Sequence, residues 1–440
     1  MSKVIEIVSA EEAVKAIKSG DNIHISSVAT TPLNLIDAMV ERGRNGELKD
    51  VVIHHIHTEG AMGYAQKEFE GTFQLDSFFV GGNVRKFTQS GYADYIPAFL
   101  NDTPRLYDRG EMPCDVVLMQ CSEPDEHGYV SMGTSVDLMP SVLGCKPIVI
   151  ASINKYMPRT FGDGFVHLSE IDYLCRKDEP LHEVHSVPAT PEEELIGRYC
   201  AELIEDGACL QMGIGSIPNA VLSKLTNHKN LGIHTEMCAD GVLPLIESGI
   251  VTGANKGVDK GKVITTFCLG SKKLYDFTNN NPGFELKSCK YTNDPFIISK
   301  NPKTTSINSA VQIDLTGQVC ADSIGMRFYS GVGGQVDFVY GSSRSEKGIS
   351  MIALQSVTNK GISKIAPILD PGAGVVTSRP NVHYIVTEYG AVNLRGKSLQ
   401  ERSALLTSIA HPDHRETLEK ATFDRFGPHY TYVKARTLQK

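Results

Sequence analysis

Short apolar runs, glycine turns and helical patterns follow one another along this chain. Residues 207–212 form a nearly continuous apolar run, which is typical of a strand buried on both faces of a parallel sheet. Gly213 and Gly215 then turn the chain. Pro218 favours a helix that begins at or just before it, because proline lacks the N–H that a first helical turn leaves unpaired. The apolar positions that this helix is expected to bury are Ala220, Val221, Leu222 and Leu225.

The same order of elements is predicted near the start of the chain. Residues 22–26 predict a strand, residues 27–31 a turn, and Pro32 the start of a helix with apolar positions at helical spacing. Residues 51–57 predict the next strand.

Matching segments indicate that these two regions belong to a duplicated domain. Residues 56–59 and 233–236 both read Ile-His-Thr-Glu, and residues 171–174 can be aligned with 382–385. The segment 186–191 carries two prolines among small residues, which favours an extended linker. We therefore predict an α/β fold of two structurally similar open α/β domains. Their expected bounds are 1–186 and 192–440.

Composition narrows the classes of function. The chain has 440 residues, of which 41% are apolar and 21% charged, as in ordinary globular proteins. A net charge of −8 argues against nucleic-acid or anionic membrane surfaces, and no apolar stretch has the length of a membrane span. The ten cysteines show no Cys-x-x-Cys spacing, and the first twenty residues lack the features of a signal or transit peptide. We expect a cytoplasmic protein with reduced thiols.

The glycine turn after residue 212 is a candidate anion site. Backbone N–H groups and the positive end of a helix dipole receive phosphate at such a turn. It lacks the third glycine of the dinucleotide fingerprint, so a nicotinamide cofactor is disfavoured. A tight turn without a ligand remains the alternative.

Two glutamates occupy matching places at the ends of predicted strands, where ligands bind in open parallel sheets. Glu236 belongs to the half that carries Gly213 and Gly215, whereas Glu59 belongs to the half with residues 26–30 in their place. We favour Glu236 as the reactive carboxylate. The alternatives are a residue retained at the domain interface for Glu59 and an ion-paired carboxylate for Glu236.

Two polar clusters in the first half have structural explanations that we favour. His54, His55 and His57 lack recurring acidic or cysteine ligands, so polar pairing near the interface is favoured over a metal site. The segment 123–128 follows a predicted strand at 115–120, and a hydrogen-bonded turn is its default interpretation.

Three features of the second half suit chemistry on an anionic acyl carrier. The glycine loop 330–338 could aim backbone N–H groups at one oxygen, as an oxyanion hole requires. Residues 385–396 predict a strand that leaves into a loop and then a helix. Glu388 in this segment either binds substrate or pairs with Arg395 or Arg402. Lys360 is either a phosphate contact or a solvated loop lysine.

Taken together, the motifs resemble the class I coenzyme A transferases of the acetyl-CoA hydrolase/transferase type. The segments that carry the resemblance are 125–129, 213–218, 234–237, 331–338 and 387–395. The resemblance implies that Glu236 forms a covalent intermediate and that Gly334 assists catalysis. It implies coenzyme A contacts at Gln211, Met212, Gly213, Ile214, Gly215, Gly333, Gly334 and Lys360.

The implied function is transfer of coenzyme A between short-chain carboxylic acids through a glutamyl-CoA thioester, with 4-hydroxybutyryl-CoA and acetate as the expected pair. A carboxylate is ionised near neutrality and can attack a thioester. The resemblance implies no metal and no cofactor beyond coenzyme A as a substrate, and a homodimer or homotetramer. A short-chain acyl-CoA hydrolase with the same glutamate, or a non-catalytic protein that binds coenzyme A or another anion, is the alternative.

Overall fold

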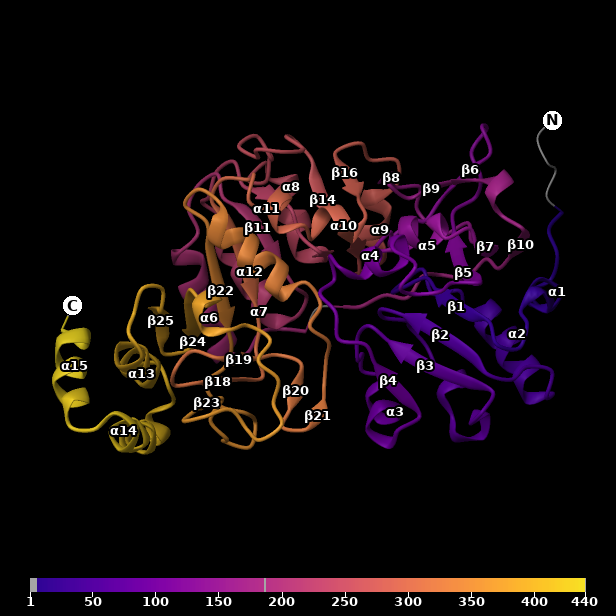
Figure 1. Cartoon of the computed structure of the whole chain (residues 1–440). Coiled ribbons are helices and arrows are strands. Elements are labelled where there is room, and N and C mark those ends of the chain that lie inside the picture. Colours follow the sequence, from indigo (N-terminus) through magenta and orange to yellow (C-terminus); the bar gives the residue numbers. More distant parts are fainter. Residues whose placement is uncertain (1–5, 186, 440) are drawn as a thin grey trace.

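Each half of the chain builds a parallel sheet, and the two sheets lie side by side (Figure 1). The computed structural model describes residues 6–185 and 187–439. The first sheet has seven parallel strands in the order β10-β7-β5-β1-β2-β3-β4. Its strands are β1 (Asn22–Ile25), β2 (Val51–His55), β3 (Phe73–Ser77), β4 (Ala93–Tyr95), β5 (Val116–Cys121), β7 (Ile148–Ile153) and β10 (Tyr173–Arg176).

The second sheet has six strands in the order β12-β11-β17-β22-β24-β25. All neighbours are parallel except the hairpin of β24 and β25. Its strands are β11 (Cys209–Met212), β12 (Gly232–Ile233), β17 (Thr304–Asn308), β22 (Ile349–Ala353), β24 (Tyr384–Thr387) and β25 (Gly390–Asn393).

The two sheets share one strand order, which confirms the predicted fold of two similar open α/β units. The order β10-β7-β5-β1-β2 in the first half corresponds to β24-β22-β17-β11-β12 in the second. Beyond β12, a single bridge between His234 and Ile264 leads to β14 (Val263–Thr265), which pairs with β16 (Phe284–Leu286). These two strands correspond to β3 and β4. The aligned segments 171–174 and 382–385 contribute to the matching strands β10 and β24.

The predicted elements around the glycine turn are confirmed. β11 ends at Met212, and α7 (Ser216–Lys224) begins two residues before Pro218. Its predicted core positions are all buried: Ala220, Val221, Leu222 and Leu225. Strand β5, predicted at 115–120, is buried along its length, as expected for a parallel strand covered on both faces.

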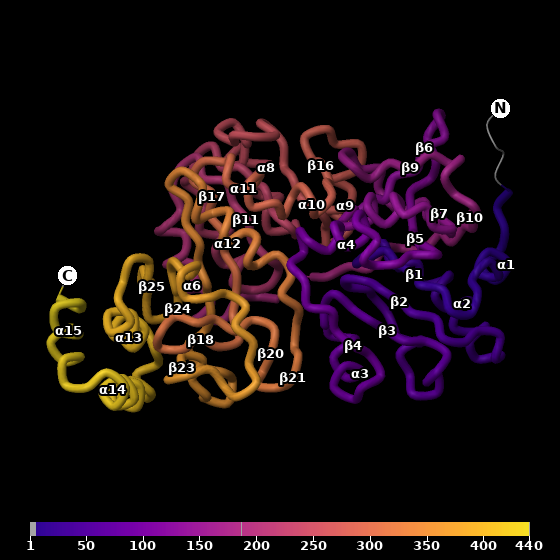
Figure 2. The backbone as a smooth tube through the Cα atoms, viewed as in Figure 1, coloured from indigo at the N-terminus to yellow at the C-terminus, as the bar shows by residue number. Residues whose placement is uncertain are grey.

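The halves are joined by strands as well as by apolar packing. β16 of the second half pairs with β8 (Phe161–Gly162) of the first. The Cys289 N–H donates to the carbonyl of Asp137 at 2.8 Å. One core cluster contains Val28 and Ile56 together with Ile233 of the other half. Figure 2 shows the backbones of the two halves in contact along one side of each.

Helices surround both sheets, and the last three lie at the edge farthest from the first half (Figures 1 and 2). The helices assigned in the described residues are α1 (Ala10–Ala13), α2 (Leu33–Arg44), α3 (Arg85–Ser90), α4 (Thr103–Asp108), α5 (Met139–Gly144), α6 (Pro191–Glu202), α7, α8 (Leu243–Glu247), α9 (Lys272–Thr278), α10 (Cys289–Thr292), α11 (Pro295–Ile298), α12 (Gln335–Arg344), α13 (Leu399–Ser408), α14 (Pro412–Phe426) and α15 (His429–Leu438). None of them is long and apolar enough to cross a membrane.

One predicted segment differs from the structure. Residues 385–396 were expected to run from a strand through a loop into a helix, but β24 turns back at once into β25. The helix α13 starts only at Leu399, where Ser398 and Glu401 form a capping box. The hairpin adds an antiparallel edge strand, which the sequence pattern did not distinguish from a loop.

The linker at 186–191 includes residue 186, which lies outside the described residues. After it, α6 starts at Pro191 behind a capping box formed by Thr190 and Glu193. The domain bounds 1–186 and 192–440 stay a prediction.

Candidate active site between the two halves

Glu236 lies where the second sheet is interrupted. β12 ends at Ile233, and pairing resumes in β13 (Met237–Cys238) with β15 (Phe267–Cys268). Buried Lys256 spans the interruption by donating from Nζ to the carbonyls of Ile233 at 3.0 Å and Lys262 at 2.8 Å. The main-chain carbonyl of Glu236 accepts from the Thr266 N–H at 3.0 Å. The backbone at Glu236 is thus fixed although its side chain has left the regular ladder.

Neutral donors surround the Glu236 carboxylate. Nδ2 of the buried Asn293 donates to Oε2 at 2.8 Å. Burial raises the pKa of Glu236 to about 7, against the lowering effects of this amide and of the Gly334 N–H. A Cβ added at Gly334 would stand 1.9 Å from Oε2, so only glycine lets the loop backbone approach this closely.

A buried histidine supports the Asn293 segment. His234 donates from Nε2 to the carbonyl of Thr292 at 2.8 Å. Burial lowers the pKa of His234 to about 4, so its imidazole is neutral at pH 7 and one ring nitrogen donates. The ring therefore fixes the backbone immediately before Asn293.

The glycine loop 330–334 is held by the first half of the chain. The Val332 N–H donates to the hydroxyl of Tyr95 at 3.0 Å, and the Leu100 N–H donates to the carbonyl of Gly333 at 3.0 Å. A Cβ added at Gly331 would meet the Phe79 ring at 2.8 Å. Residues from the first half thereby determine where the loop stands relative to Glu236.

Glu236 opens onto a cavity of about 300 Å³ beneath this loop. The loop and the end of β11 both line it, and Gln211 is fixed there by reciprocal amide hydrogen bonds with Asn308 at 3.3 and 3.2 Å. Of the residues predicted for the site, the cavity brings together Gln211, Met212, Gly213, Gly333, Gly334 and Glu236.

A second cavity of about 340 Å³ lies at the start of α7. Ile214 and Gly215, both predicted contacts, line it together with Gly213 and Lys364. Gly215 has a φ of 119°, which other residues rarely adopt, and it leaves the N-terminus of α7 without a side-chain cap. The first turn of this helix lines the cavity, where the Ser216 hydroxyl donates to the Glu193 carboxylate at 2.6 Å.

Two family models match most of the chain. Residues 3–185 match the acetyl-CoA hydrolase/transferase N-terminal domain, and residues 270–422 match the acetyl-CoA hydrolase/transferase C-terminal domain. The chain belongs to the acetyl-CoA hydrolase/transferase family.

Named relatives and a solved structure agree with the family. A 4-hydroxybutyrate coenzyme A transferase from Clostridium kluyveri is 45% identical over 96% of this chain and 98% of its own. A succinyl-CoA:acetate/propanoyl-CoA:succinate CoA transferase from Fasciola hepatica is 46% identical over 95% and 87%. RipA from Yersinia pestis superposes with a TM-score of 0.90 at 34% identity, over 97% and 98%. Acetyl-CoA hydrolases match at only 25% and 24% identity. The chain is a CoA-transferase.

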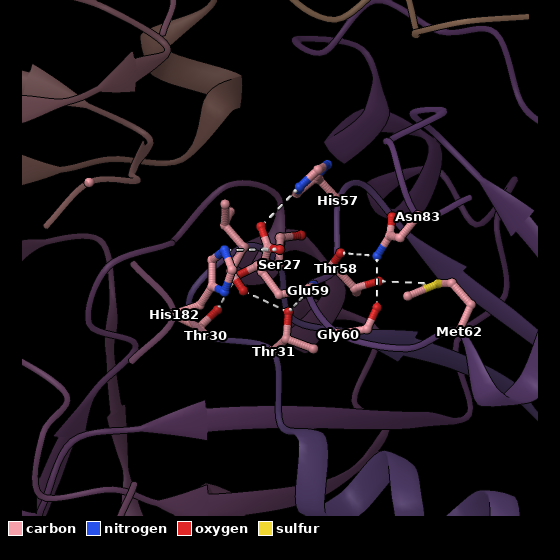
Figure 3. A network of polar contacts seen from close by, with 12 residues as sticks. Ser27, Thr30, Thr31, His57, Thr58, Glu59, Gly60, Met62, Asn83 and His182 are labelled. Carbon is pink, nitrogen blue, oxygen red and sulfur yellow. Dashed lines mark hydrogen bonds and ion pairs between the residues drawn. The ribbon is translucent and has the colours of Figure 1, made fainter. Parts of the chain in front are cut away.

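The second candidate glutamate of this transferase has a different setting. The Glu59 carboxylate lies 3.1 Å from Nε2 of His57 and 3.3 Å from Nε2 of His182 (Figure 3). Its backbone N–H donates to the Thr31 hydroxyl at 3.0 Å. Two imidazoles from different segments thus hold Glu59, in agreement with the polar pairing expected of His57.

The other two histidines of this cluster, His54 and His55, are buried in the first sheet. Among the residues that the structure describes, neither ring nitrogen of His55 has a hydrogen-bond partner, so the polar pairing expected of it is not formed. His24 and His54 are register neighbours in the sheet, and burial lowers the pKa of His54 and of His55, the latter to about 3. Within the described ranges, no group of three or more His, Cys, Asp or Glu side chains is arranged to hold a metal. The turn at 123–128 is hydrogen-bonded as predicted, with Asp125 accepting from the N–H of His127 at 3.0 Å.

Glu388 does not form the ion pair with Arg395 or Arg402 that was one of its two expected roles. Its carboxylate accepts from the backbone N–H and the hydroxyl of Ser356 at 2.9 and 2.5 Å. Arg402 instead donates to main-chain carbonyls, including that of Arg379 at 2.8 Å, and no ion pair joins Glu388 to Arg395. Glu388 therefore stabilises the chain after β22 through neutral donors.

Lys360 lies exposed in the turn 358–362, where its N–H donates to the Thr358 hydroxyl. The lysine that lines the cavity at α7 is Lys364, which the sequence analysis missed. Asn293 was not among the predicted site residues either. The only signal for it is the helix start Asn-Asp-Pro at 293–295, which marks a turn without indicating what the amide contacts.

Proposed function

We propose that this enzyme moves coenzyme A between short-chain carboxylic acids, with Glu236 as the nucleophile. The observation that carries the proposal is the setting of its carboxylate, which borders a cavity and is held by the Asn293 amide without a cation. Such donors fix the carboxylate and leave its charge available for attack.

The reaction balances without any further reagent. The Glu236 carboxylate attacks the thioester carbonyl, the C–S bond breaks, and a mixed anhydride and coenzyme A thiolate form. The thiolate then attacks the glutamyl carbonyl, which gives a glutamyl-CoA thioester and releases the first acid as a carboxylate. A second carboxylate reverses these steps and leaves as its CoA ester.

The glycine loop supplies stabilisation for the oxyanions of these steps. Gly333 and Gly334 stand beside the Glu236 carboxyl group, and the Gly334 N–H donates to it; one such donor contributes on the order of 3 kcal/mol in acyl transfer. Because no acid or base has to move a proton, no catalytic histidine is needed.

Coenzyme A is proposed to bind along the two cavities. Gln211, Met212 and Gly213 line the first, and the start of α7 lines the second. Helix N-termini favour phosphate, and Lys364 adds a cation at this place. Lys364 thereby takes the role that the sequence analysis gave to Lys360.

The proposed substrates are 4-hydroxybutyryl-CoA and acetate, supported by the named Clostridium relative. We further propose that the enzyme uses no cofactor beyond coenzyme A, acts in the cytoplasm and forms a homodimer or homotetramer.

Intact mass after mixing with acetyl-CoA or 4-hydroxybutyryl-CoA, without an acceptor acid, tests the nucleophile. Wild type should gain the mass of coenzyme A minus water, and Glu236→Gln should gain nothing. The matched control Glu59→Gln should still form the adduct. Steady consumption of the ester without an adduct would favour a hydrolase, and an adduct on Glu236→Gln would refute the assignment.

A further inference from the structure

Polar contacts run from the start of α4 in the first half to Asp337, directly after the glycine loop, and to Asp294, directly after Asn293. Asn101, just before α4, donates from its backbone N–H to Asp337 Oδ2 at 3.2 Å and from Nδ2 to Asp337 Oδ1 at 2.5 Å. Asp337 lies in the first turn of α12, directly after the glycine loop. Both side chains are buried, with 8% and 2% of their surface exposed.

Arg105 fixes which way the Asn101 amide points. Its guanidinium donates to both the carbonyl and the Oδ1 of Asn101. Because a guanidinium only donates, Oδ1 must face Arg105, and Nδ2 must face Asp337. Arg105 also lies 3.5 Å from the Asp294 carboxylate, next to Asn293. One arginine of the first half therefore holds two segments of the second.

The amide of Asn293 stands between two carboxyl groups. Its Nδ2 donates to Glu236 at 2.8 Å, and its side chain also favours the ionised form of Asp337. Burial raises the pKa of Asp337 to about 7, and the charge of Glu236 contributes to the rise. The Asn293 amide itself is fully buried, and the chain on either side of it is held at Thr292 and Asp294.

We propose that Asp337 and Asn101 are positioning residues for transfer, which hold the Asn293 amide and the glycine loop so that the Glu236 carboxylate points at the thioester. This inference rests on the proposed role of Glu236. Through Asn101, the first half of the chain takes part in the chemistry, although Glu59, the matching glutamate of that half, is held by His57 and His182.

The physical reason is that Asn101, Asp337 and Asn293 are short side chains with fixed partners. Asn101 cannot rotate without losing Arg105, and Asp337 cannot move without leaving two donors buried and unpaired. A displacement of about 1 Å at a reacting group can lower a rate by about 100-fold, so loss of this support should appear in the chemical step.

A double-mutant cycle on the rate of thioester formation tests the proposal. Asn101→Ala and Asp337→Asn should each slow formation of the adduct about tenfold or more, with the KM for acyl-CoA changed less than about twofold. The double variant should be no slower than the slower single variant, because the two residues act as one unit. Additive losses, or singles that react at the wild-type rate, would overturn the proposal.

Controls separate positioning from folding and from the proposed function. Asp314→Asn changes another buried aspartate that accepts four hydrogen bonds, and it should lower the melting temperature without slowing adduct formation. If Asp337→Asn does not fold, the more exposed Arg105→Ala replaces it in the cycle and should slow adduct formation in the same way. If wild type forms no adduct, the proposed function fails; if it does and the variants match it, only the positioning role fails.

Discussion

Glu59 and Glu236 end the same four-residue motif at matching places in two sheets of one topology, yet their surroundings differ in kind. Glu59 lies against the imidazoles of His57 and His182, whereas Glu236 is held by the amide of Asn293. Two histidine side chains engage the Glu59 carboxylate, whereas a neutral amide holds that of Glu236, whose ionised form can attack a substrate.

The turns beside the two glutamates also differ, because one is filled by a side chain and the other is open. In the first half, Val28 adopts a φ of 54° and is almost fully buried, so it fills its turn at the expense of backbone strain. In the second half, Gly213 and Gly215 leave open space around the backbone. Duplication has thus produced one closed turn that packs and one open turn that can admit a ligand.

The largest effect is expected from adding a methyl group at Gly334, where the loop backbone lies against the Glu236 carboxylate. Gly334→Ala would place a methyl group 1.9 Å from Glu236 Oε2 and 2.1 Å from Asn293 Nδ2, so the loop or the carboxylate must move. We expect kcat/KM to fall at least about 100-fold with the fold retained. Steady-state kinetics with circular dichroism measure this. Gly144→Ala, with no neighbour within 4 Å, is the control and should act like wild type; equal activity of both variants would contradict the close approach.

The pH profile should report Glu236 and not Glu59. Burial raises the pKa of Glu236 to about 7, and only the ionised form attacks, so kcat/KM should rise with pH and level off above about 7. One unit below that value, activity should be about tenfold below the plateau. Glu59→Gln should leave the midpoint in place, and a midpoint that moves with Glu59 would reverse the roles of the two residues.

Local patterns predicted the frame of the site but not its contacts. Pro218, the glycine turn and the repeated motif ending in Glu236 depend on neighbours in sequence, and the structure has the expected strand, turn and helix there. Asn293 and Asp337 reach Glu236 only through the folding of distant segments against each other. No periodicity or spacing carries that information.

The ion pair considered for Glu388 is absent for a related reason. Arg395 and Arg402 are near it in sequence and opposite in charge, which made pairing a natural expectation. The hairpin of β24 and β25 and the start of α13 instead carry Arg402 toward main-chain carbonyls, while Ser356 of a neighbouring connection reaches Glu388. Charge complementarity along the chain does not determine which groups the sheet brings together.

The smallest expected effect concerns the free energy of unfolding. Replacing Glu236 should raise it, and replacing Glu59 should lower it. The pKa of folded Glu236 is raised above the unfolded value, so the folded state keeps its proton longer and loses stability as pH rises from about 4.5 to about 7. At pH 8, Glu236→Gln should therefore stabilise the protein, by about 1 to 3 kcal/mol, and at pH 4 it should change little. Glu59→Gln removes the carboxylate from two histidine partners and should lower stability slightly. Denaturant unfolding of both variants at pH 4 and pH 8 tests both expectations. If Glu236→Gln destabilises the protein at pH 8, burial of the Glu236 charge does not oppose folding. The two glutamates then differ less in their effect on stability than their contacts indicate.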